Sequence, residues 1–362
     1  MRTTGRDHTT LFGFLLWAAA CSPTASPSAP SLAQVPEVST SRHQADDFPL
    51  YGLGSRHGHR DCNERGFRAF DFWLGNWNVY GQDGQIGGTN SVTRELEGCA
   101  IEEHWTDRAG GRGRSLNTFD AGTGKWNQLW MEATGLAILL EGESAPGRIN
   151  MSGDTPKFIG GPIITNRITW TRLAPDRVRQ YWEISEDGRM TWVPAFDGDY
   201  RREPQFHPAA ETPNTFCESP ARLRYHWFDF IVGSWEMREA GDKGRGLGQL
   251  EVAKDLSGCL LEWRFRGRGG YSGKAFAAFH FPSLQWHRTW VDEDGVRIGL
   301  TGQLVGTSMV FTGTRVVRHG RTQLVRATWQ PVDANQVTER WETSEDEGTT
   351  WQSALEVVLS RR

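Results

Sequence analysis

The chain has 362 residues, enough for two or three ordinary domains. Charged residues make up 23% of it and hydrophobic residues 37%, which is typical of packed domains rather than of disordered proteins. No apolar run reaches the roughly 20 residues that a transmembrane helix needs. The formal net charge of -4 disfavours a nucleic-acid partner, because such a partner normally requires a basic surface.

The N-terminus has the layout of a secretory signal. Arg2 and Arg6 supply positive charge, and residues 11–20 form an apolar core too short to cross a bilayer. The core ends in Ala-Ala-Ala-Cys at Cys21, which resembles the lipobox of bacterial lipoproteins. That resemblance implies a signal peptide over 1–20 and a lipid on Cys21. Ordinary signal cleavage just before Cys21 is the alternative.

The stretch that follows is rich in Pro, Ser and Ala, and it reads SPTASPSAPSLAQVPEVSTSRHQ. Such a composition cannot bury a core, so we expect residues 21–59 to form a flexible tether. A lipidated Cys21 would leave four cysteines, an even number suited to an oxidising compartment. We therefore expect an exported lipoprotein of the cell envelope or outer membrane. A periplasmic or secreted protein is the alternative.

An internal repeat is the most informative feature of the sequence. FDFWLGNWNV at 70–79 recurs as FDFIVGSWEM at 228–237, and LEGCAIEEHW at 96–105 recurs as LSGCLLEWRF at 256–265. Matching positions stay 158 to 160 residues apart along the whole length, which indicates a duplication. Each copy is large enough to fold around its own core. We place the two domains at 60–203 and 215–362, joined by a proline-containing linker over 204–214.

The cysteines follow the repeat. Cys99 and Cys259 occupy equivalent positions, and Cys62 and Cys217 each lie shortly before the FDF segment. Symmetry favours the disulfides Cys62–Cys99 and Cys217–Cys259, although four cysteines allow three connectivities.

Local patterns point to strands in both copies. Apolar and polar residues alternate in runs such as KWNQLWME and RVRQYWEI, and turns such as DAGTG and DEDGVR separate these runs. No stretch shows a convincing helical period. About eight to ten short strands fit each copy, which predicts an all-β sandwich or an antiparallel barrel.

A family resemblance narrows that choice. Gly-Asn-Trp at 75–77 with Arg-Arg at 201–202, repeated as Gly-Ser-Trp at 233–235 with Arg-Arg at 361–362, resembles the calycins. These are lipocalin-like and nitrobindin-like β-barrels, in which a basic residue of the last strand packs on the tryptophan of the first. The motifs that recur in the same order in both copies are similar to those of a bacterial domain family of unknown function that is grouped with the calycins. The resemblance implies two tandem antiparallel calycin-like β-barrels.

One strand face in each copy has the composition of a small-molecule pocket. Gln128, Trp130 and Glu132 share a face, as do Trp290 and Asp292 in the second copy. An aromatic wall with a few polar anchors is how such pockets are built, whereas tryptophans in an ordinary core are the alternative. Candidate ligand-binding residues therefore also include a polar pair of the first copy that alanines replace in the second: Ser115 and Asn117.

We expect an exported protein that binds a small apolar or amphipathic ligand in a barrel, and that meets the membrane only through its lipid. An enzyme on the same scaffold is one alternative, with Glu102 and His104 as the acid–base pair because they share a strand face. A protein-interaction module at the envelope is the other, with unknown partners. No metal or cofactor is expected. A haem bound by one histidine, as in nitrobindin-like barrels, is the alternative cofactor.

Overall fold

The computed structural model describes residues 50–51, 62–203, 215–241, 243–316 and 322–362. The expected signal peptide, the lipidation site Cys21 and the linker over 204–214 lie outside these residues, as does most of the expected tether. Among the helices in the described residues, none is long and apolar enough to cross a membrane.

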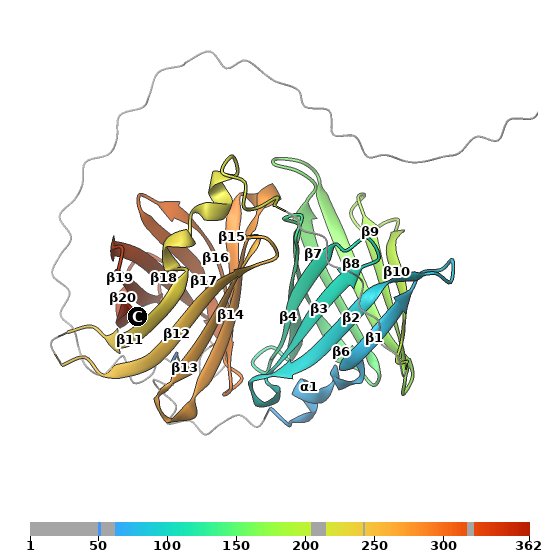
Figure 1. Ribbon diagram of the computed structural model, residues 1–362, viewed down its shortest axis with the longest axis horizontal. Helices are drawn as coiled ribbons and strands as arrows, with labels where there is room; N and C mark the ends of the chain where they lie inside the picture. The colour runs from blue at the N-terminus through green and yellow to red at the C-terminus, as the bar shows by residue number, and fades with distance from the viewer. Residues whose placement is uncertain (1–49, 52–61, 204–214, 242, 317–321) are drawn as a thin grey trace, which may run out of the picture. The chain divides into compact units, whose positions relative to one another are not determined.

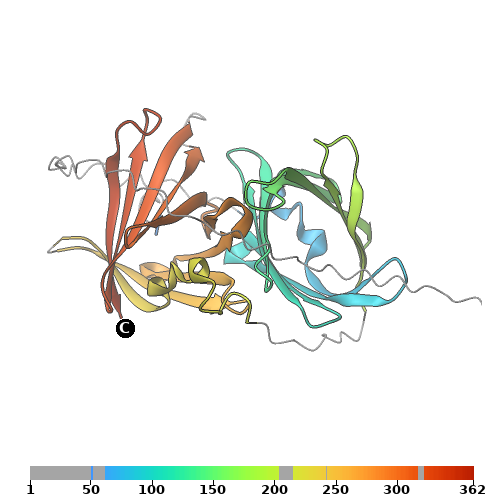
Figure 2. The same cartoon turned by 90° about the horizontal axis from the view of Figure 1, so that it is seen from above.

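The first repeat folds into a closed barrel of ten antiparallel strands, each paired with its sequence neighbours, and the first strand pairs with the tenth to close the ring. Figure 2 shows these strands as a ring. They are β1 (Gly75–Tyr80), β2 (Ile86–Glu95), β3 (Ala100–Asp107), β4 (Arg112–Asp120), β5 (Lys125–Glu132), β6 (Ala137–Ala145), β7 (Arg148–Pro156), β8 (Ile163–Ala174), β9 (Arg177–Ser185) and β10 (Val193–Arg201).

The second repeat forms a second closed barrel with the same order of strands (Figure 1). The expected architecture, two tandem antiparallel β-barrels, is therefore confirmed. The second set of strands is β11 (Gly233–Glu239), β12 (Gly246–Asp255), β13 (Leu260–Gly267), β14 (Ser272–His280), β15 (Gln285–Asp292), β16 (Arg297–Val305), β17 (Ser308–Val316), β18 (Thr322–Asp333), β19 (Gln336–Ser344) and β20 (Gln352–Arg361).

The FDF segment of each repeat becomes a short helical turn that supplies the aromatic core of its barrel. In the first barrel Phe70 and Trp73 are fully buried against Trp170. In the second, Phe228 contacts Trp329 in the same way. The short helices are α1 (Arg65–Arg68) and the 3-10 turns Asp71–Trp73, Leu96–Gly98, Leu223–His226, Asp229–Ile231, Arg268–Gly270 and Phe281–Ser283.

The Gly-x-Trp motif and the terminal arginines meet in both barrels. The guanidinium of Arg202 lies 4.7 Å from the Trp77 ring, and that of Arg361 lies 4.3 Å from the Trp235 ring. Gly75 has a φ of 126°, a conformation that favours glycine, and a Cβ there would lie 2.9 Å from the Arg202 side chain. The glycine therefore makes room for the arginine that covers the tryptophan.

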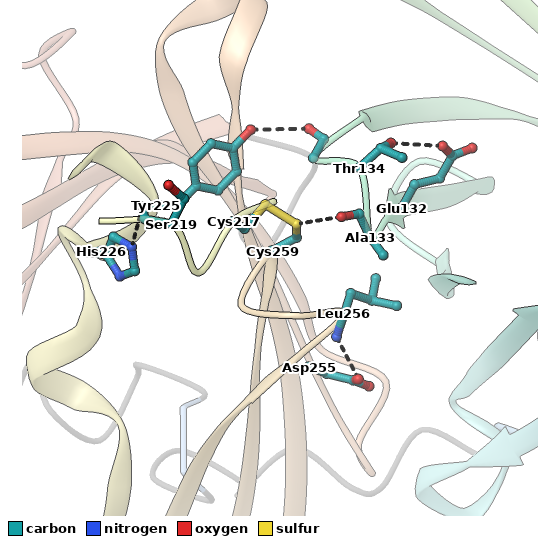
Figure 3. Close-up of a disulfide and its surroundings, with 11 residues drawn as sticks. Glu132, Ala133, Thr134, Cys217, Ser219, Tyr225, His226, Asp255, Leu256 and Cys259 are labelled. Atoms are coloured by element: carbon teal, nitrogen blue, oxygen red, sulfur yellow. Dashed lines mark hydrogen bonds between the residues drawn. A yellow bond between two sulfur atoms is a disulfide. The ribbon is translucent and has the colours of Figure 1, made fainter. Parts of the chain in front are cut away.

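Both disulfides join the cysteines that symmetry favoured, Cys62 to Cys99 and Cys217 to Cys259. Each links the segment before a barrel to the turn that precedes the third strand of that barrel. Figure 3 shows the second of them, with the sulfur of Cys259 3.2 Å from the carbonyl oxygen of Ala133. Two disulfides are typical of proteins that mature in an oxidising compartment.

Strand alternation separates two kinds of buried side chain. Trp126 of β5 belongs to the core inside the first barrel. Leu129 and Met131 of the same strand point the other way and belong to a cluster that contains residues of the second barrel. Outward residues of β3, β4 and β5 are thus buried by contact with the second repeat. An apolar residue in these strands is therefore not by itself a sign of the barrel interior.

Candidate functional site

A polar network lies inside the first barrel. The carboxylate of Glu103 accepts hydrogen bonds from Asn90 Nδ2 at 2.7 Å and from Ser115 Oγ at 2.7 Å. Asn117 Nδ2 donates to Ser115 Oγ at 2.9 Å, and Gln128 Nε2 donates to Asn117 Oδ1 at 2.8 Å. All five residues are buried. The structure thus brings together Ser115, Asn117 and Gln128, three of the four polar residues that the sequence singled out in β4 and β5.

The network centres on the carboxyl group of Glu103, whose pKa lies near neutral pH. Burial raises the pKa of Glu103 to about 7, against the opposing effect of hydrogen bonds from Ser115 and Asn90. Tyr200 lies next to it, since Asn90 Nδ2 is 3.4 Å from the Tyr200 hydroxyl. Burial and the charge of Glu103 raise the pKa of this phenol, so the hydroxyl stays protonated. It donates to Gln180.

Four aromatic side chains of the first barrel flank this network and are only partly buried. Trp105 contacts Phe196 with ring centroids 6.0 Å apart, and Trp182 is paired with Phe196 across β9 and β10. Trp130 lies over Gly113, where a Cβ would come within 2.4 Å of the indole, and Gly113 pairs with Trp105. These four side chains form what we call the aromatic rim: Trp105, Trp130, Trp182 and Phe196.

The equivalent side chains of the second barrel are buried. They are Phe265, Trp290, Trp341 and Leu355. The side chain that covers them comes from far away in the sequence: the ring centroid of Tyr51 is 4.8 Å from that of Phe265 and 5.3 Å from that of Trp290. Its hydroxyl donates to Glu339 at 2.7 Å. Tyr51 belongs to the range that we expected to be a flexible tether, yet it is 4% exposed.

The acidic candidates at the strand ends, Glu132 and Asp292, form hydrogen bonds within the turns that follow their strands. Asp292 accepts hydrogen bonds from the backbone N–H groups of Asp294 at 3.1 Å and Val296 at 3.0 Å, and burial raises its pKa to about 7. Trp290 Nε1 donates to the same carboxylate at 3.4 Å. Glu132, its counterpart, accepts from Thr134 Oγ1 at 3.1 Å. Both carboxyl groups therefore have structural partners in the turn that follows their strand.

The expected acid–base pair forms, but outside the barrel. His104 Nε2 lies 2.9 Å from Glu102 Oε1. Glu102 is buried among charged groups, where it contacts Arg114 of its own repeat and Lys274 of the second repeat. The pair lies on the outward face of β3, because Glu103, one residue along, points to the inside.

The outer face of the first barrel carries a hollow of about 390 Å³ that is lined by polar side chains of β7, β8 and β9, among them Arg148 and Tyr181. Two arginines of its lining already have carboxylate partners, Arg167 with Glu183 at 2.9 Å and Arg179 with Asp197 at 2.7 Å. We favour the interior network over this hollow, because two of the hollow's three arginines are already paired and aromatic side chains flank the network.

Sequence reasoning missed several members of the interior network. Asn90 pairs with Trp105, and Glu103 pairs with Ser115, across neighbouring strands. Ser115 was already a candidate, so its register with β3 would have identified Glu103. Gln180 carried a weaker signal, because it replaces Glu339 of the second repeat. Asn90 carried none that a single sequence reveals.

Glu103→Gln is expected to remove a pH dependence of stability. The pKa of this carboxyl is raised from 4.5 to about 7 on folding, so its ionised form destabilises the fold above pH 7. As pH falls from about 7 to 4.5, the folded state takes up this proton and the free energy of unfolding rises by about 3 kcal/mol. Urea unfolding at several pH values should show this rise in the parent chain and in the exposed control Glu141→Gln only. A parent-minus-Gln difference that is constant with pH would contradict the assignment.

Comparisons with known proteins add little to this geometry. No family model matches the chain, and no curated protein matches it. One similar structure is a protein of unknown function of the DUF3598 family from Nostoc punctiforme PCC 73102, with 11% identity, a TM-score of 0.18 and coverage of 83% of this chain and 100% of that one. Another is transferrin binding protein B from Haemophilus parasuis Hp5, with 8% identity, a TM-score of 0.16 and coverage of 76% and 65%. We build no argument on likenesses this weak.

Proposed function

We propose that this is an exported envelope protein that binds a small hydrophobic or amphipathic ligand inside its first barrel. The observation that carries the proposal is the difference between the two barrels. The aromatic rim of the first barrel is partly exposed beside a buried polar network, whereas the equivalent side chains of the second barrel are buried and Tyr51 packs on two of them, Phe265 and Trp290. The first barrel thus offers the surface that the second one covers with its own chain.

The chemistry of the first barrel favours an amphipathic ligand. Partly exposed aromatic rings supply apolar contact area, and three of the four rim residues are tryptophans. Across the strands from them, Ser115 pairs with Trp130 and Asn90 with Trp105, and with Glu103 they offer a fixed set of donors and acceptors that would orient one polar group. A few converging polar groups under an apolar wall are typical of small-molecule sites.

Export is supported by two independent features. The sequence of residues 1–21 resembles a lipoprotein signal, and the two disulfides fit an oxidising compartment. A lipid on Cys21 would hold the ligand-binding barrels at a membrane surface.

The proposal predicts saturable binding of N-phenyl-1-naphthylamine, a neutral apolar fluorophore, at one site per chain. Trp130→Ala should weaken that binding by about tenfold, because one ring of the wall is lost. The matched control is Trp192→Ala, since the Trp192 ring lies 3.8 Å from the Arg167 guanidinium on the outer face of the barrel. The measurement is a fluorescence titration of the delipidated chain, with circular dichroism to verify folding of both variants.

Two outcomes count against the proposal. One is the absence of any saturable signal in the parent chain. The other is equal affinity in the parent and Trp130→Ala chains, which would place the fluorophore elsewhere on the protein.

A further inference from the structure

The interior of the second barrel contains a buried arginine that the proposed function does not use. Arg288 of β15 is 1% exposed. Its guanidinium carbon lies 4.9 Å from the Trp329 ring, 5.4 Å from the Trp263 ring and 5.7 Å from the Trp290 ring. None of its three guanidinium nitrogens forms a hydrogen bond with any residue that the structure describes. Buried donors almost always have partners, so this group calls for an acceptor.

The nearest acidic neighbour does not provide that acceptor. Glu339 is fully buried, and its Oε1 accepts hydrogen bonds from the Tyr51 hydroxyl at 2.7 Å and from Trp341 Nε1 at 2.6 Å. No ion pair within 4.0 Å joins Arg288 to a carboxylate among the described residues. Glu339 Oε2 has no hydrogen-bond partner among the described residues either, and the charges of Glu339 and Tyr51 act on Arg288 without satisfying its N–H donors. Unsatisfied buried donors are destabilising, and an anion that enters the site would remove part of that penalty.

We propose that the second barrel binds a small monocarboxylate with an aromatic body, whose carboxylate pairs with Arg288 and whose ring takes the place of the Tyr51 phenol. A guanidinium offers two parallel N–H groups, which match the two oxygens of a carboxylate. The three tryptophans around Arg288 provide apolar walls for the body of the ligand. One arginine beside Glu339 favours a single negative charge over a doubly charged phosphate.

Tyr51 marks the position of the ring. Its phenol already lies 4.8 Å from Phe265 and 5.3 Å from Trp290, which is ordinary spacing for an aromatic ligand in contact with both. Its backbone φ of 54° lies in the left-handed region that costs an aromatic residue energy. Tyr51 is therefore an own-chain occupant that is held by its side-chain contacts and can be displaced by a ligand that makes the same contacts.

The anion preference is confined to the second barrel. Gln128 occupies the position of Arg288 in the first barrel, and Gln180 occupies the position of Glu339. Each barrel has a buried carboxyl group in its interior, Glu103 in the first and Glu339 in the second, but Glu339 is offset by the charge of Arg288. The two barrels therefore bind ligands of different charge.

The test is calorimetric titration of the full chain with benzoate and with benzamide, its neutral counterpart. Removal of the own-chain occupant in Tyr51→Ala should tighten benzoate binding at least tenfold, because the open state becomes the populated one. In the same variant benzamide should bind at least tenfold more weakly than benzoate. Adding Arg288→Met should abolish this preference, whereas adding Trp130→Ala in the first barrel should leave it unchanged.

Three results would overturn the inference. They are equal affinities of benzoate and benzamide in Tyr51→Ala, benzoate binding that survives Arg288→Met, and no benzoate binding to Tyr51→Ala at concentrations on the order of 10 mM. The comparison of the two ligands keeps Arg288 in place, so it decides the question even where Arg288→Met fails to fold.

Discussion

Glu102→Gln is expected to lower the free energy of unfolding by about 3–5 kcal/mol, because it removes one carboxylate from a buried charge cluster and leaves its cations with fewer partners. Glu102 is 2% exposed and contacts both Arg114 and Lys274, two side chains that are also about 5% exposed. Lys274 belongs to the second repeat, and its Nζ also lies 2.9 Å from Glu262 Oε1. The loss of one carboxylate therefore unbalances a charge cluster shared by both barrels.

The cluster contains the same kind of ion pair twice, once in each direction between the repeats, which explains why a single member matters. Arg114 of the first repeat reaches Glu262 of the second at 3.0 Å, and Lys274 reaches Glu102 in the reverse direction. Burial alone would raise the pKa of Glu262, but a hydrogen bond from Arg264 and the charges of Lys274 and Arg114 outweigh it and lower the pKa to about 2. The carboxylate of Glu262 therefore remains ionised at neutral pH.

Urea unfolding monitored by circular dichroism provides the measurement. The control Glu143→Gln removes an exposed carboxylate outside the cluster and should change the stability by at most about 0.5 kcal/mol. Glu102→Gln combined with Lys274→Met should recover part of the loss, since the unpaired cation is removed as well. A loss below about 1 kcal/mol in the single variant would mean that the cluster is solvated and that its contacts contribute little.

The second large effect is expected from removal of one disulfide. In Cys217→Ser with Cys259→Ser, the second barrel loses a bridge between cysteines 42 residues apart. The entropy of an unfolded loop of this length predicts a loss of about 4 kcal/mol. Both cysteines are fully buried, so the change also places two hydroxyl groups in an apolar environment.

Thermal unfolding of the parent and variant chains measures this loss. A reductant should lower the melting temperature of the parent chain towards that of the variant. The equivalent variant of the first barrel, which opens a loop of 37 residues, should lose a similar amount. A change below about 1 kcal/mol in the second-barrel variant would indicate that its denatured state is already restricted without the bridge.

Much of the architecture could be predicted because repetition carries it. The constant spacing of motifs identified two domains, and the strand alternation indicated an all-β fold. The equivalent positions of Cys99 and Cys259 favoured the disulfide pairing that the structure confirms. Each of these inferences uses local or periodic information, which a single sequence contains in full.

The candidate site was harder because alternation reveals which residues share a face but not which face points inward. Glu102 and His104 do share a face, and that face points outward. Glu103 lies on the other face, where it meets Ser115. A shift of one residue thus exchanges an ion pair outside the barrel for the centre of the interior network.

Contacts between the two repeats, and the contact of Tyr51 with the second barrel, could not be predicted. Tyr51 and Glu339 are 288 residues apart. The apolar run FPLYGL at 48–53 distinguishes this part of the expected tether from its Pro-, Ser- and Ala-rich start, but it does not reveal which barrel the run contacts. Lys274 and Glu102 meet only because two repeats pack together, and packing between repeats leaves no periodic signal. The unpartnered state of Arg288 is likewise a property of three-dimensional surroundings.

Native mass spectrometry of the chain, purified without detergent from its own host, tests the central claim most directly. The account predicts an added mass of one small molecule per chain, which Trp130→Ala loses and Trp192→Ala retains. An added mass that persists in Trp130→Ala, or a parent protein without any added mass, would contradict the claim that the first barrel binds a ligand.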